Sequence, residues 1–406
     1  MKVLGIIAEY NPFHKGHLYH LTESKLLSEA DVCVAVMSGN FVQRGEAAML
    51  SKWERAAAAV GCGIDLALEL PFIYACNNAE LFARGAVRIL NGLNCVDYIS
   101  FGSESGDLTE LAGAARAITS ETENFKKSLK EHLDRGVSFP RARALAVMDI
   151  FGEETSALLE SPNNILAAEY LKQLSLTDSQ IVPLTVKRKG HGDNSLELDG
   201  EFAGAAAIRR RLAETESAET IGDYVPGECF EFIKKYNIDI NKMINTLFLL
   251  ISAKIFTENE GELGKILSAG EGLESKLLKE IRGCDSLEAL ISRVKSKRYT
   301  RTRIQRLLIH TLFGLNSEEF WEIEKTGLIY TRVLAFNEKG AALLKKIKAG
   351  DPQVPVVTNI NKQAGSLGEM MKILRYDIAA GDIYNLISGG DIRRRSDYTV
   401  APHHKF

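Results

Sequence analysis

Short apolar runs alternate with amphipathic stretches over the first 105 residues of the chain. Residues 3–8 (VLGIIA) and 32–37 (VCVAVM) are continuous apolar runs, and the segment between them carries apolar residues at helical spacing. This order predicts strand–helix–strand, the unit that builds a parallel sheet through a right-handed crossover. The alternation continues through "SKWERAAAAVGCG", "IDLALELP", "AELFARGAVRILNGL" and "VDYISFGSES". The pattern predicts an α/β fold with a Rossmann-like, doubly wound parallel sheet.

The pattern changes in the second half of the chain. The segment "SQIVPLTVKRK" (179–189) predicts a late strand that returns to the same sheet, whereas residues 240–350 show no convincing alternation of strands and helices. Two prolines in 351–358 (DPQVPVVT) indicate a boundary or another late strand. We therefore expect a catalytic domain at 1–205, a helical domain at 206–350, and a C-terminal segment at 351–406 that could return to pack on the helical domain.

Composition restricts the class of protein. A chain of 406 residues with 45% hydrophobic and 25% charged residues is typical of a soluble globular protein with a substantial core. The net charge of -3 gives no global nucleic-acid signature, so a basic site must come from local clustering. The six cysteines contain no CxxC pair and are expected to be free thiols. We see no signal peptide and no apolar stretch of about 20 residues, the length that spans a bilayer, so a cytoplasmic protein is expected.

The segment "EYNPFHKGH" follows the first predicted strand. In an open parallel sheet, ligands bind outside the carboxyl ends of the strands. Gly16 would let the backbone approach a phosphate, and the N–H groups of the helix start, from about His17, would face the anion. His14 and His17 could donate to one phosphate group and stabilise the charge that builds on an α-phosphate as pyrophosphate leaves.

Two other interpretations of the histidine pair exist. His14 and His17 could be exposed loop and helix-start residues without a role in chemistry. They could also be metal ligands, but no nearby Cys or third His completes a zinc set, so no metal site is predicted. The position directly after a first strand at the N-terminus favours nucleotide binding.

The motif "HKGH" resembles the HxGH signature of the nucleotidyltransferase superfamily. Together with "MSGNFVQRGEAAMLSKWERA", "DLALELPF", "FGSESGD", "FPRARA", "SPNNILAAEYLK" and "SKRYTRTRIQRLLIH", the chain resembles the bacterial tRNA(Met) cytidine acetate ligases. The similarity runs from Met1 to about Phe336. The joint occurrence of these motifs is specific, whereas HxGH alone is not.

The resemblance implies an enzyme that uses ATP to activate acetate as acetyl-adenylate. The acetyl group then passes to N4 of the wobble cytidine of elongator tRNA(Met). Mg²⁺ is expected with the ATP phosphates, without a protein ligand that the sequence identifies, and the oligomeric state is not predicted. The resemblance assigns catalysis to His14 and His17, and ATP binding to Ile7, Ala8, Glu9, Tyr10, Asn11, Pro12, Phe13, His14, Lys15, Gly16, His17, Leu18, Tyr19, His20, Gly102, Asn163 and Arg188.

Two departures from the family pattern affect the phosphate contacts. In "FAGAAAIRRRL" (202–212), Ala205 and Ala206 stand where the family carries hydroxyl side chains, while Arg209 remains. A cationic contact is therefore expected here without the hydroxyl contacts to the β- and γ-phosphates. The segment "KGHGDNS" (189–195) is also less aromatic than the family pattern.

Several polar residues near the strand ends have more than one interpretation. The loop "SGNFVQRGE" (38–46), with Asn40, Gln43 and Arg44, is either a substrate-contacting loop or a solvated one. Trp53 and Arg55 are expected to provide helix packing and a surface charge. Ser103 and Glu104 end a strand that faces the same crevice. They could contact the nucleotide or a substrate, or they could have a structural role.

The segment "KSKRYTRTRIQR" (295–306) is rich in Lys and Arg. By itself it is typical of a solvated basic face, but with an RNA substrate implied it predicts tRNA contacts at Lys297, Arg298, Arg301 and Arg303. A second basic run, "SGGDIRRRSDYT" (388–399), has no assigned role. Two alternatives to the ligase are a small-molecule adenylyltransferase and a catalytically weak RNA-binding protein that kept the fold.

Overall fold

A mostly parallel sheet lies at the centre of the molecule. The computed structural model describes residues 1–119, 122–189, 198, 202–393 and 395–405. The strand order is β10-β8-β5-β2-β1-β6-β7, with β9 paired to β8. The strands are β1 (Val3–Ala8), β2 (Val32–Ser38), β5 (Leu66–Leu70), β6 (Tyr98–Ser103), β7 (Val182–Lys187), β8 (Thr331–Asn337), β9 (Val356–Val357) and β10 (His403–Lys405), and β3 (Phe41–Val42) pairs with β4 (Glu46–Ala47) separately.

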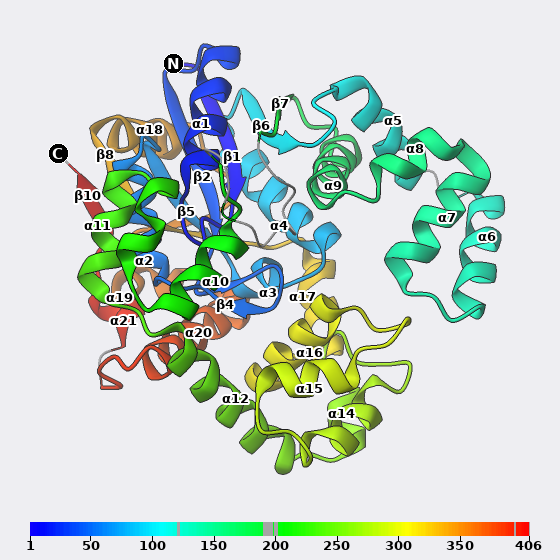
Figure 1. Cartoon of the computed structure of the whole chain (residues 1–406). Helices are drawn as coiled ribbons and strands as arrows, with labels where there is room; N and C mark the ends of the chain where they lie inside the picture. Colours follow the sequence, from blue (N-terminus) through cyan, green and yellow to red (C-terminus); the bar gives the residue numbers. More distant parts are fainter. Residues whose placement is uncertain (120–121, 190–197, 199–201, 394, 406) are drawn as a thin grey trace.

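The predicted doubly wound arrangement is confirmed for the first half of the chain. Strands β2, β1, β6 and β7 run parallel, as strand–helix–strand units require, with Gly5 opposite Val34 and Ile99. Helices cover both faces (Figure 1), and the alternate residues of β1, such as Val3 and Leu4, enter two separate hydrophobic cores. The helices of this half are α1 (Lys15–Ser28), α2 (Lys52–Gly61), α3 (Phe72–Ala75), α4 (Ala79–Gly92), α5 (Leu108–Thr119), α6 (Glu123–Asp134), α7 (Phe139–Phe151), α8 (Glu153–Leu158) and α9 (Pro162–Leu176).

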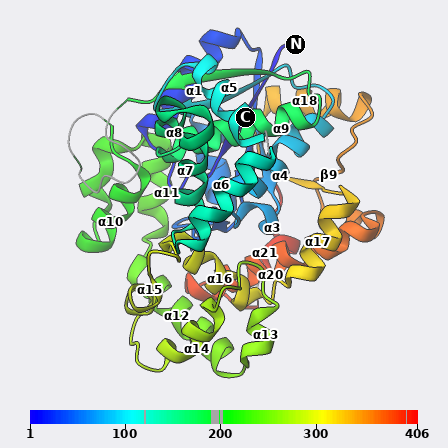
Figure 2. The ribbon, with the colours of Figure 1, turned by 90° about the vertical axis from the view of Figure 1, so that its right-hand side faces the viewer.

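The second half of the chain forms a helical region and also returns to the sheet. Figure 1 shows α12–α16 as a group below the sheet, and Figure 2 shows α20 and α21 between this group and the sheet. The helices are α10 (Ala205–Thr215), α11 (Gly227–Tyr236), α12 (Ile240–Phe256), α13 (Glu260–Gly264), α14 (Leu273–Ile281), α15 (Leu287–Val294), α16 (Arg301–Phe313), α17 (Ser317–Thr326), α18 (Glu338–Ala349), α19 (Ile360–Gln363), α20 (Met371–Ile387) and α21 (Ser396–Thr399), with short 3₁₀ helices at Ala218–Tyr224, Ala364–Ser366 and Gly368–Met370.

Strand β8 lies within residues 240–350, where the sequence shows no convincing alternation of strands and helices. It pairs antiparallel with β5 and is itself the partner of β9 and β10. Sequence alternation missed it because β8 follows helix α17 and has no second strand near it in the chain. The late strand expected at 351–358 exists as β9, and α20 contacts α12 and α16. The catalytic sheet thus includes residues that we had placed in the helical domain and the C-terminal segment.

A buried ion network joins the C-terminal segment to the sheet. Lys52 Nζ lies 2.9 Å from Glu69 Oε1 and 2.5 Å from Asp397 Oδ1. Arg332 Nη2 lies 2.5 Å from Glu69 Oε2 and 2.6 Å from Asp397 Oδ1. All four side chains are at most 3% exposed. Gly381 of α20 makes room for Asp397, since a Cβ there would overlap the carboxylate. The basic run at 388–399 therefore contributes a carboxylate that packs against the sheet.

Three of the cysteines predicted to be free thiols, Cys33, Cys76 and Cys229, are buried, and all six are free. Burial raises the pKa of the Cys76 thiol to about 12. In the described part of the chain, no helix has both the length and the apolar character needed to cross a membrane.

Candidate functional site

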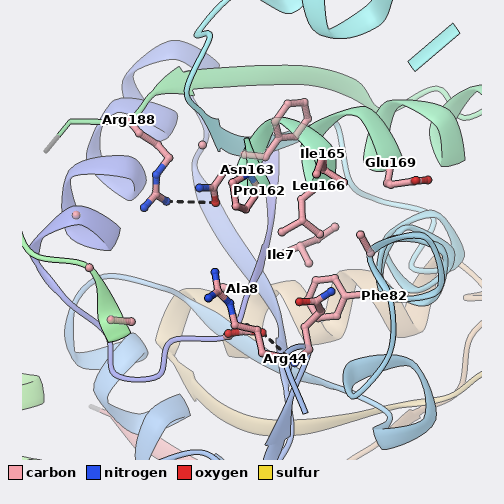
Figure 3. Close-up of a pocket in the computed structure, with 18 of the residues that line it drawn as sticks. Ile7, Ala8, Arg44, Phe82, Pro162, Asn163, Ile165, Leu166, Glu169 and Arg188 are labelled. Atoms are coloured by element: carbon pink, nitrogen blue, oxygen red, sulfur yellow. Dashed lines mark hydrogen bonds between the residues drawn. The ribbon is translucent and has the colours of Figure 1, made fainter. Parts of the chain in front are cut away.

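A cavity of about 560 Å³ opens at the carboxyl ends of β1, β6 and β7. This volume is in the range of small-molecule and cofactor sites. The β1–α1 turn, α4, α7, α9, the start of α10 and the start of α16 complete its lining. In Figure 3, Arg188 and Asn163 lie on one side of the cavity, while Ile7, Phe82 and Leu166 lie together on another. The cavity therefore has a polar side and an apolar side.

Most of the residues that the resemblance assigned to ATP lie at this cavity. They are Ile7, Ala8, Glu9, Tyr10, Asn11, His14, Gly16, His17, Tyr19, His20, Gly102, Asn163 and Arg188. The others, Pro12, Phe13, Lys15 and Leu18, do not belong to the cavity lining that the described residues form. Phe13 is instead buried against Tyr10 and His17, with ring centroids 4.7 and 5.6 Å away. Phe13 thus packs against residues of the β1–α1 turn and does not line the cavity.

The two histidines form one unit at the start of α1. His14 occupies the N-cap position, and its backbone N–H donates to Nδ1 of His17 over 3.2 Å. The rings stack with their centroids 3.7 Å apart, and the edge of His17 meets Tyr10 at 5.0 Å. Because Nδ1 of His17 accepts a hydrogen bond, the proton of the neutral ring is at Nε2. His17 can therefore donate from Nε2.

Gly16 has a more specific role than we expected. A Cβ at this position would lie 2.9 Å from Cε1 and 3.0 Å from Nδ1 of His14. Real Cβ atoms essentially never make such short contacts, so any other residue would displace the His14 ring. The glycine of the HxGH motif thus leaves space for its first histidine, in addition to any close approach of phosphate to the backbone.

Burial keeps His17 and His20 neutral. Burial is the largest cause that lowers the pKa of His17 well below its ordinary value, and His14 and Arg188 lower it further. Burial and Arg188 also lower the pKa of His20 to about 4. His17 and His20 are therefore neutral hydrogen-bonding groups at neutral pH, and the positive charge of the site comes from arginine and lysine side chains.

The ends of β6 and β7 form the polar side of the cavity. Arg188 Nη1 donates to Asn163 Oδ1 over 3.4 Å, and Asn163 Nδ2 donates to Glu104 Oε1 over 2.7 Å. Gly102 leaves room for Arg188, because a Cβ there would lie 3.3 Å from Arg188 Cγ. Glu104 also accepts from the backbone N–H of Asn164 at the start of α9. Glu104 thus joins β6 to α9, which favours the structural interpretation of this residue.

The loop after β2 connects the catalytic turn to the helical region. Gln43 N–H donates to Glu9 Oε1 over 2.9 Å, and Gln43 and Arg44 line the cavity, as expected of a substrate-contacting loop. Glu46 accepts from Arg209 Nη2 at 2.9 Å and from Gln305 Nε2 at 3.0 Å. Gly45, with φ +79°, lies between Gln43 and Glu46. Because Gly45 has no side chain, the backbone of helix α16 can pack closely against this loop.

Arg55 and Asn40 have different roles from those predicted. Arg55 is 1% exposed and donates to the carbonyl oxygens of Glu9, Ser38 and Leu50, so it is not a surface charge. Asn40 is buried and accepts from the backbone N–H of Lys52 over 2.8 Å. Arg55 binds backbone groups that follow β1, end β2 and precede α2, and Asn40 binds the first residue of α2. These roles could not be seen in the local sequence because the partners come from several segments.

The start of α10 carries the departure in the phosphate motif. The cavity is lined here by Gly204, Ala205 and Ala206. The start of α10 therefore offers backbone groups to the cavity but no hydroxyl side chains. Arg209 also lines the cavity, and its guanidinium donates to the Asn11 carbonyl over 2.8 Å and to Glu46. The neighbouring departure at 189–195 lies mostly outside the described residues.

The predicted tRNA contacts lie outside the cavity lining. Arg301 Nη1 donates to Glu288 over 2.7 Å, and Arg303 Nη1 donates to Glu271 over 2.6 Å. Lys297 and Arg298 precede them and are exposed. The same helix, α16, contributes Thr302 and Arg306 to the cavity, which we did not predict. The spacing of four between these residues, one helical turn, was the signal in the sequence that they share a face.

Comparison with known proteins links this geometry to a family. The family model "HIGH Nucleotidyl Transferase" matches residues 1–398. A protein of Thermoanaerobacter sp. (strain X514) named "tRNA(Met) cytidine acetate ligase" is 44% identical over 393 residues, 95% of each chain. A protein of Clostridium novyi (strain NT) with the same name is 36% identical over 405 residues, 99% of each chain.

Solved structures agree with the sequence comparison. The apo crystal structure of Thermotoga maritima TmcAL matches with a TM-score of 0.92 and 34% identity, over 100% of this chain and 99% of that one. A second crystal structure of that protein, bound with alpha-thio ATP, matches with a TM-score of 0.90 and 33% identity at the same coverage.

Proposed function

The chain belongs to the HIGH nucleotidyl transferase family, among the tRNA(Met) cytidine acetate ligases, and from this premise we propose how its cavity works. It activates acetate with ATP and transfers the acetyl group to N4 of the wobble cytidine of elongator tRNA(Met), forming N4-acetylcytidine. The observation that carries the proposal is the stacked His14–His17 pair at the carboxyl end of β1, in one cavity with Asn163 and Arg188.

The first step is an in-line displacement at the α-phosphate. A carboxylate oxygen of acetate forms a bond to the α-phosphorus, and the bond from that phosphorus to the oxygen bridging the β-phosphate breaks. Pyrophosphate leaves with the electron pair, and acetyl-adenylate remains. Positioning and charge compensation dominate such a transfer. We assign N–H donors of His14 and His17 to the oxygens on which charge builds.

The second step transfers the acetyl group. The N4 amine of the cytidine attacks the carbonyl carbon of acetyl-adenylate, the bond between that carbon and the phosphate oxygen breaks, and AMP leaves while N4 loses one proton. The base must leave its stack to reach an enclosed site. We place this reaction in the cytoplasm, where tRNA is used, and we assign the exposed part of the helical region to tRNA binding.

Magnesium is expected to enter as part of the ATP complex. Among the described residues, no group of three or more His, Cys, Asp or Glu side chains could hold a metal ion. Mg²⁺ usually keeps several waters and binds through substrate phosphates, with few protein ligands. The residues present therefore fit the use of MgATP as a substrate.

The test is acetate-dependent exchange of pyrophosphate into ATP in the absence of RNA. We expect exchange with acetate, and acetylation of cytidine when tRNA(Met) is added. A small-molecule adenylyltransferase would show exchange that depends on a different substrate. An RNA-binding protein without catalysis would show no exchange at all, and either result would contradict the proposal.

Lys297 and Arg298 are expected to contribute more to tRNA binding than Arg301 and Arg303. The two exposed residues offer their charges directly, whereas Arg301 and Arg303 bind Glu288 and Glu271 and must exchange these partners for phosphates. Substituting both Lys297 and Arg298 by Ala should weaken tRNA binding and reduce the salt dependence by roughly one unit of slope per residue. The measurement is tRNA affinity as a function of salt concentration.

A double variant on another face provides the matched control. Lys345 and Lys348 are exposed on α18, which packs on β2, β5 and β8 away from α16. Their substitution by Ala removes the same charge and should leave the salt slope unchanged. Acetyl-adenylate formation without tRNA should be normal in both variants. An equal loss of tRNA affinity in the two would mean that general charge, and not this segment, attracts the RNA.

A further inference from the structure

Arg306 of α16 is a guanidinium inside the cavity, and the proposed chemistry has not used it. Thr302 and Arg306 lie one turn apart on α16 and both line the cavity. The guanidinium donates from Nη1 to the carbonyl oxygen of Gln43 over 3.3 Å. The backbone of α16 at this point rests against Gly45, where a Cβ would lie 2.5 Å from the Arg306 nitrogen. Arg306 is thus held at a fixed position by the loop after β2.

Neighbouring arginines form ion pairs with carboxylates of the protein, whereas Arg306 forms none with the described residues. Arg209 has Glu46 at 2.9 Å, Arg143 has Glu169 at 2.7 Å, and Arg303 has Glu271 at 2.6 Å. Within the described residues, no carboxylate forms an ion pair with Arg306. Burial, with a smaller contribution from the neighbouring charge of Arg303, lowers the pKa of Arg306 to about 10.

Arg306 is half-buried, and a cation that is partly removed from water without an anion nearby is costly, so a site of this kind favours an anionic ligand. In the sheet order, β2 and the loop that follows it lie on one side of β1, and β6 and β7 lie on the other side. Gly102 belongs to β6, and Arg188 follows directly after β7. Of the nucleotide contacts that we assign, Gly102 and Arg188 thus lie across β1 from Arg306. An anion at Arg306 would be a second ligand beside the nucleotide.

The surroundings restrict the chemistry of this second ligand. Ile7 and Phe82 line the same cavity and lie together in Figure 3, so an apolar group can be buried near the end of β1. Thr302 adds a hydroxyl donor on the same face of α16 as Arg306. A guanidinium and a hydroxyl in the same cavity as these apolar side chains fit a small carboxylate with a short alkyl group better than a phosphate with no apolar part.

We propose that Arg306, with Thr302, binds the carboxylate of acetate, and that Ile7 and Phe82 bury its methyl group. This inference rests on the proposed function, because it assigns the place of one of its substrates. Arg306 orients the carboxylate on the opposite side of β1 from Gly102 and Arg188, so that one oxygen is directed at the α-phosphate that the two histidines contact. Arg306 is in this sense a determinant of acetate specificity within the basic segment of α16.

The experiment compares acetate and ATP as separate ligands of Arg306→Gln and Arg306→Lys. Acetate-dependent ATP–pyrophosphate exchange without RNA gives the KM for acetate, and equilibrium binding without acetate gives the Kd for ATP. Losing a charge-assisted hydrogen-bond pair should raise the acetate KM about 10- to 100-fold in Arg306→Gln. Arg306→Lys keeps the charge and should show a smaller rise, and ATP binding should be unchanged in both. Arg293→Gln on α15, an exposed residue that pairs with Glu280 at 3.7 Å, is the control and should behave as wild type.

Each other outcome overturns the inference. A loss of ATP affinity with an unchanged acetate KM would place Arg306 at the nucleotide phosphates, and no change in either constant would make its charge structural. If Arg306→Gln does not fold, Thr302→Val, which removes the hydroxyl at constant volume, must raise the acetate KM without changing ATP binding. In all these cases the wild-type protein still shows acetate-dependent exchange, whereas its absence in the wild type would refute the proposed function itself.

Discussion

Replacing His17 with alanine is expected to lower the rate of acetate-dependent ATP–pyrophosphate exchange by about 10²- to 10³-fold, the loss typical of one charge-stabilising donor. The Kd for ATP should change much less. The reason is that the leaving pyrophosphate and the α-phosphate gain charge as the bond breaks, so a donor aimed there acts on the transition state more than on bound ATP. Exchange rates at saturating ATP and acetate, together with equilibrium ATP binding, measure the two effects separately.

His17 also accepts the backbone N–H of His14, so part of the loss could come from a misplaced His14. His17→Asn keeps a side chain that can both accept and donate, and it should recover part of the rate if hydrogen bonding is the function. His132→Ala, on α6 and paired with Asp149 at 2.8 Å, should leave exchange unchanged. A His17→Ala protein with wild-type exchange would show that the assigned role is wrong.

Replacing Asp397 with alanine should destabilise the protein by about 3–5 kcal/mol, the cost typical of removing one partner from a buried ion pair. Asp397 lies within 2.6 Å of both Lys52 Nζ and Arg332 Nη2, and without it Glu69 would be the one carboxylate in direct ion pairs with these two buried cations among the described residues. Urea unfolding of the wild type and the variant measures the change in the free energy of unfolding.

Asp382→Ala is the matched control for this prediction. Asp382 pairs with Arg395 at 3.4 Å, but both side chains are well exposed, and exposed pairs contribute about 0–1 kcal/mol. The two variants remove the same group from the same end of the chain and differ in burial. Equal destabilisation by the two would mean that the network around Asp397 adds nothing beyond a surface ion pair.

The part of the site that could be predicted from the sequence is the part built from neighbouring residues. The strand that ends at Ala8, the turn after it and the helix start at Lys15 lie within one short segment. Apolar runs and the spacing of two histidines and a glycine therefore placed this turn at a sheet edge. Even the role of Gly16 is local, because the atom it avoids belongs to His14.

The parts that could not be predicted depend on contacts between distant segments. Strand β8 becomes a strand by pairing with β5, more than half the chain away, and Arg55 is buried because the carbonyl groups it binds come from β1 and β2. Arg306 stands in a basic segment whose other cations do not line the cavity among the described residues. A sequence pattern shows that the segment is basic, but only the docking of α16 on Gly45 decides which of its charges enters the cavity.

The strand order has a consequence for how the protein is made on the ribosome. Strands β1, β2, β5 and β6 are synthesised early, yet the partner of β5 on its outer side is β8, and the partner of β8 is β10. The nascent sheet therefore exposes an open edge at β5 while the long helical region is translated, and open edges are sites of wrong pairing. Translation must pass residue 337 before β8 can close that edge, and must reach Asp397 before the buried charges of Lys52 and Arg332 are balanced.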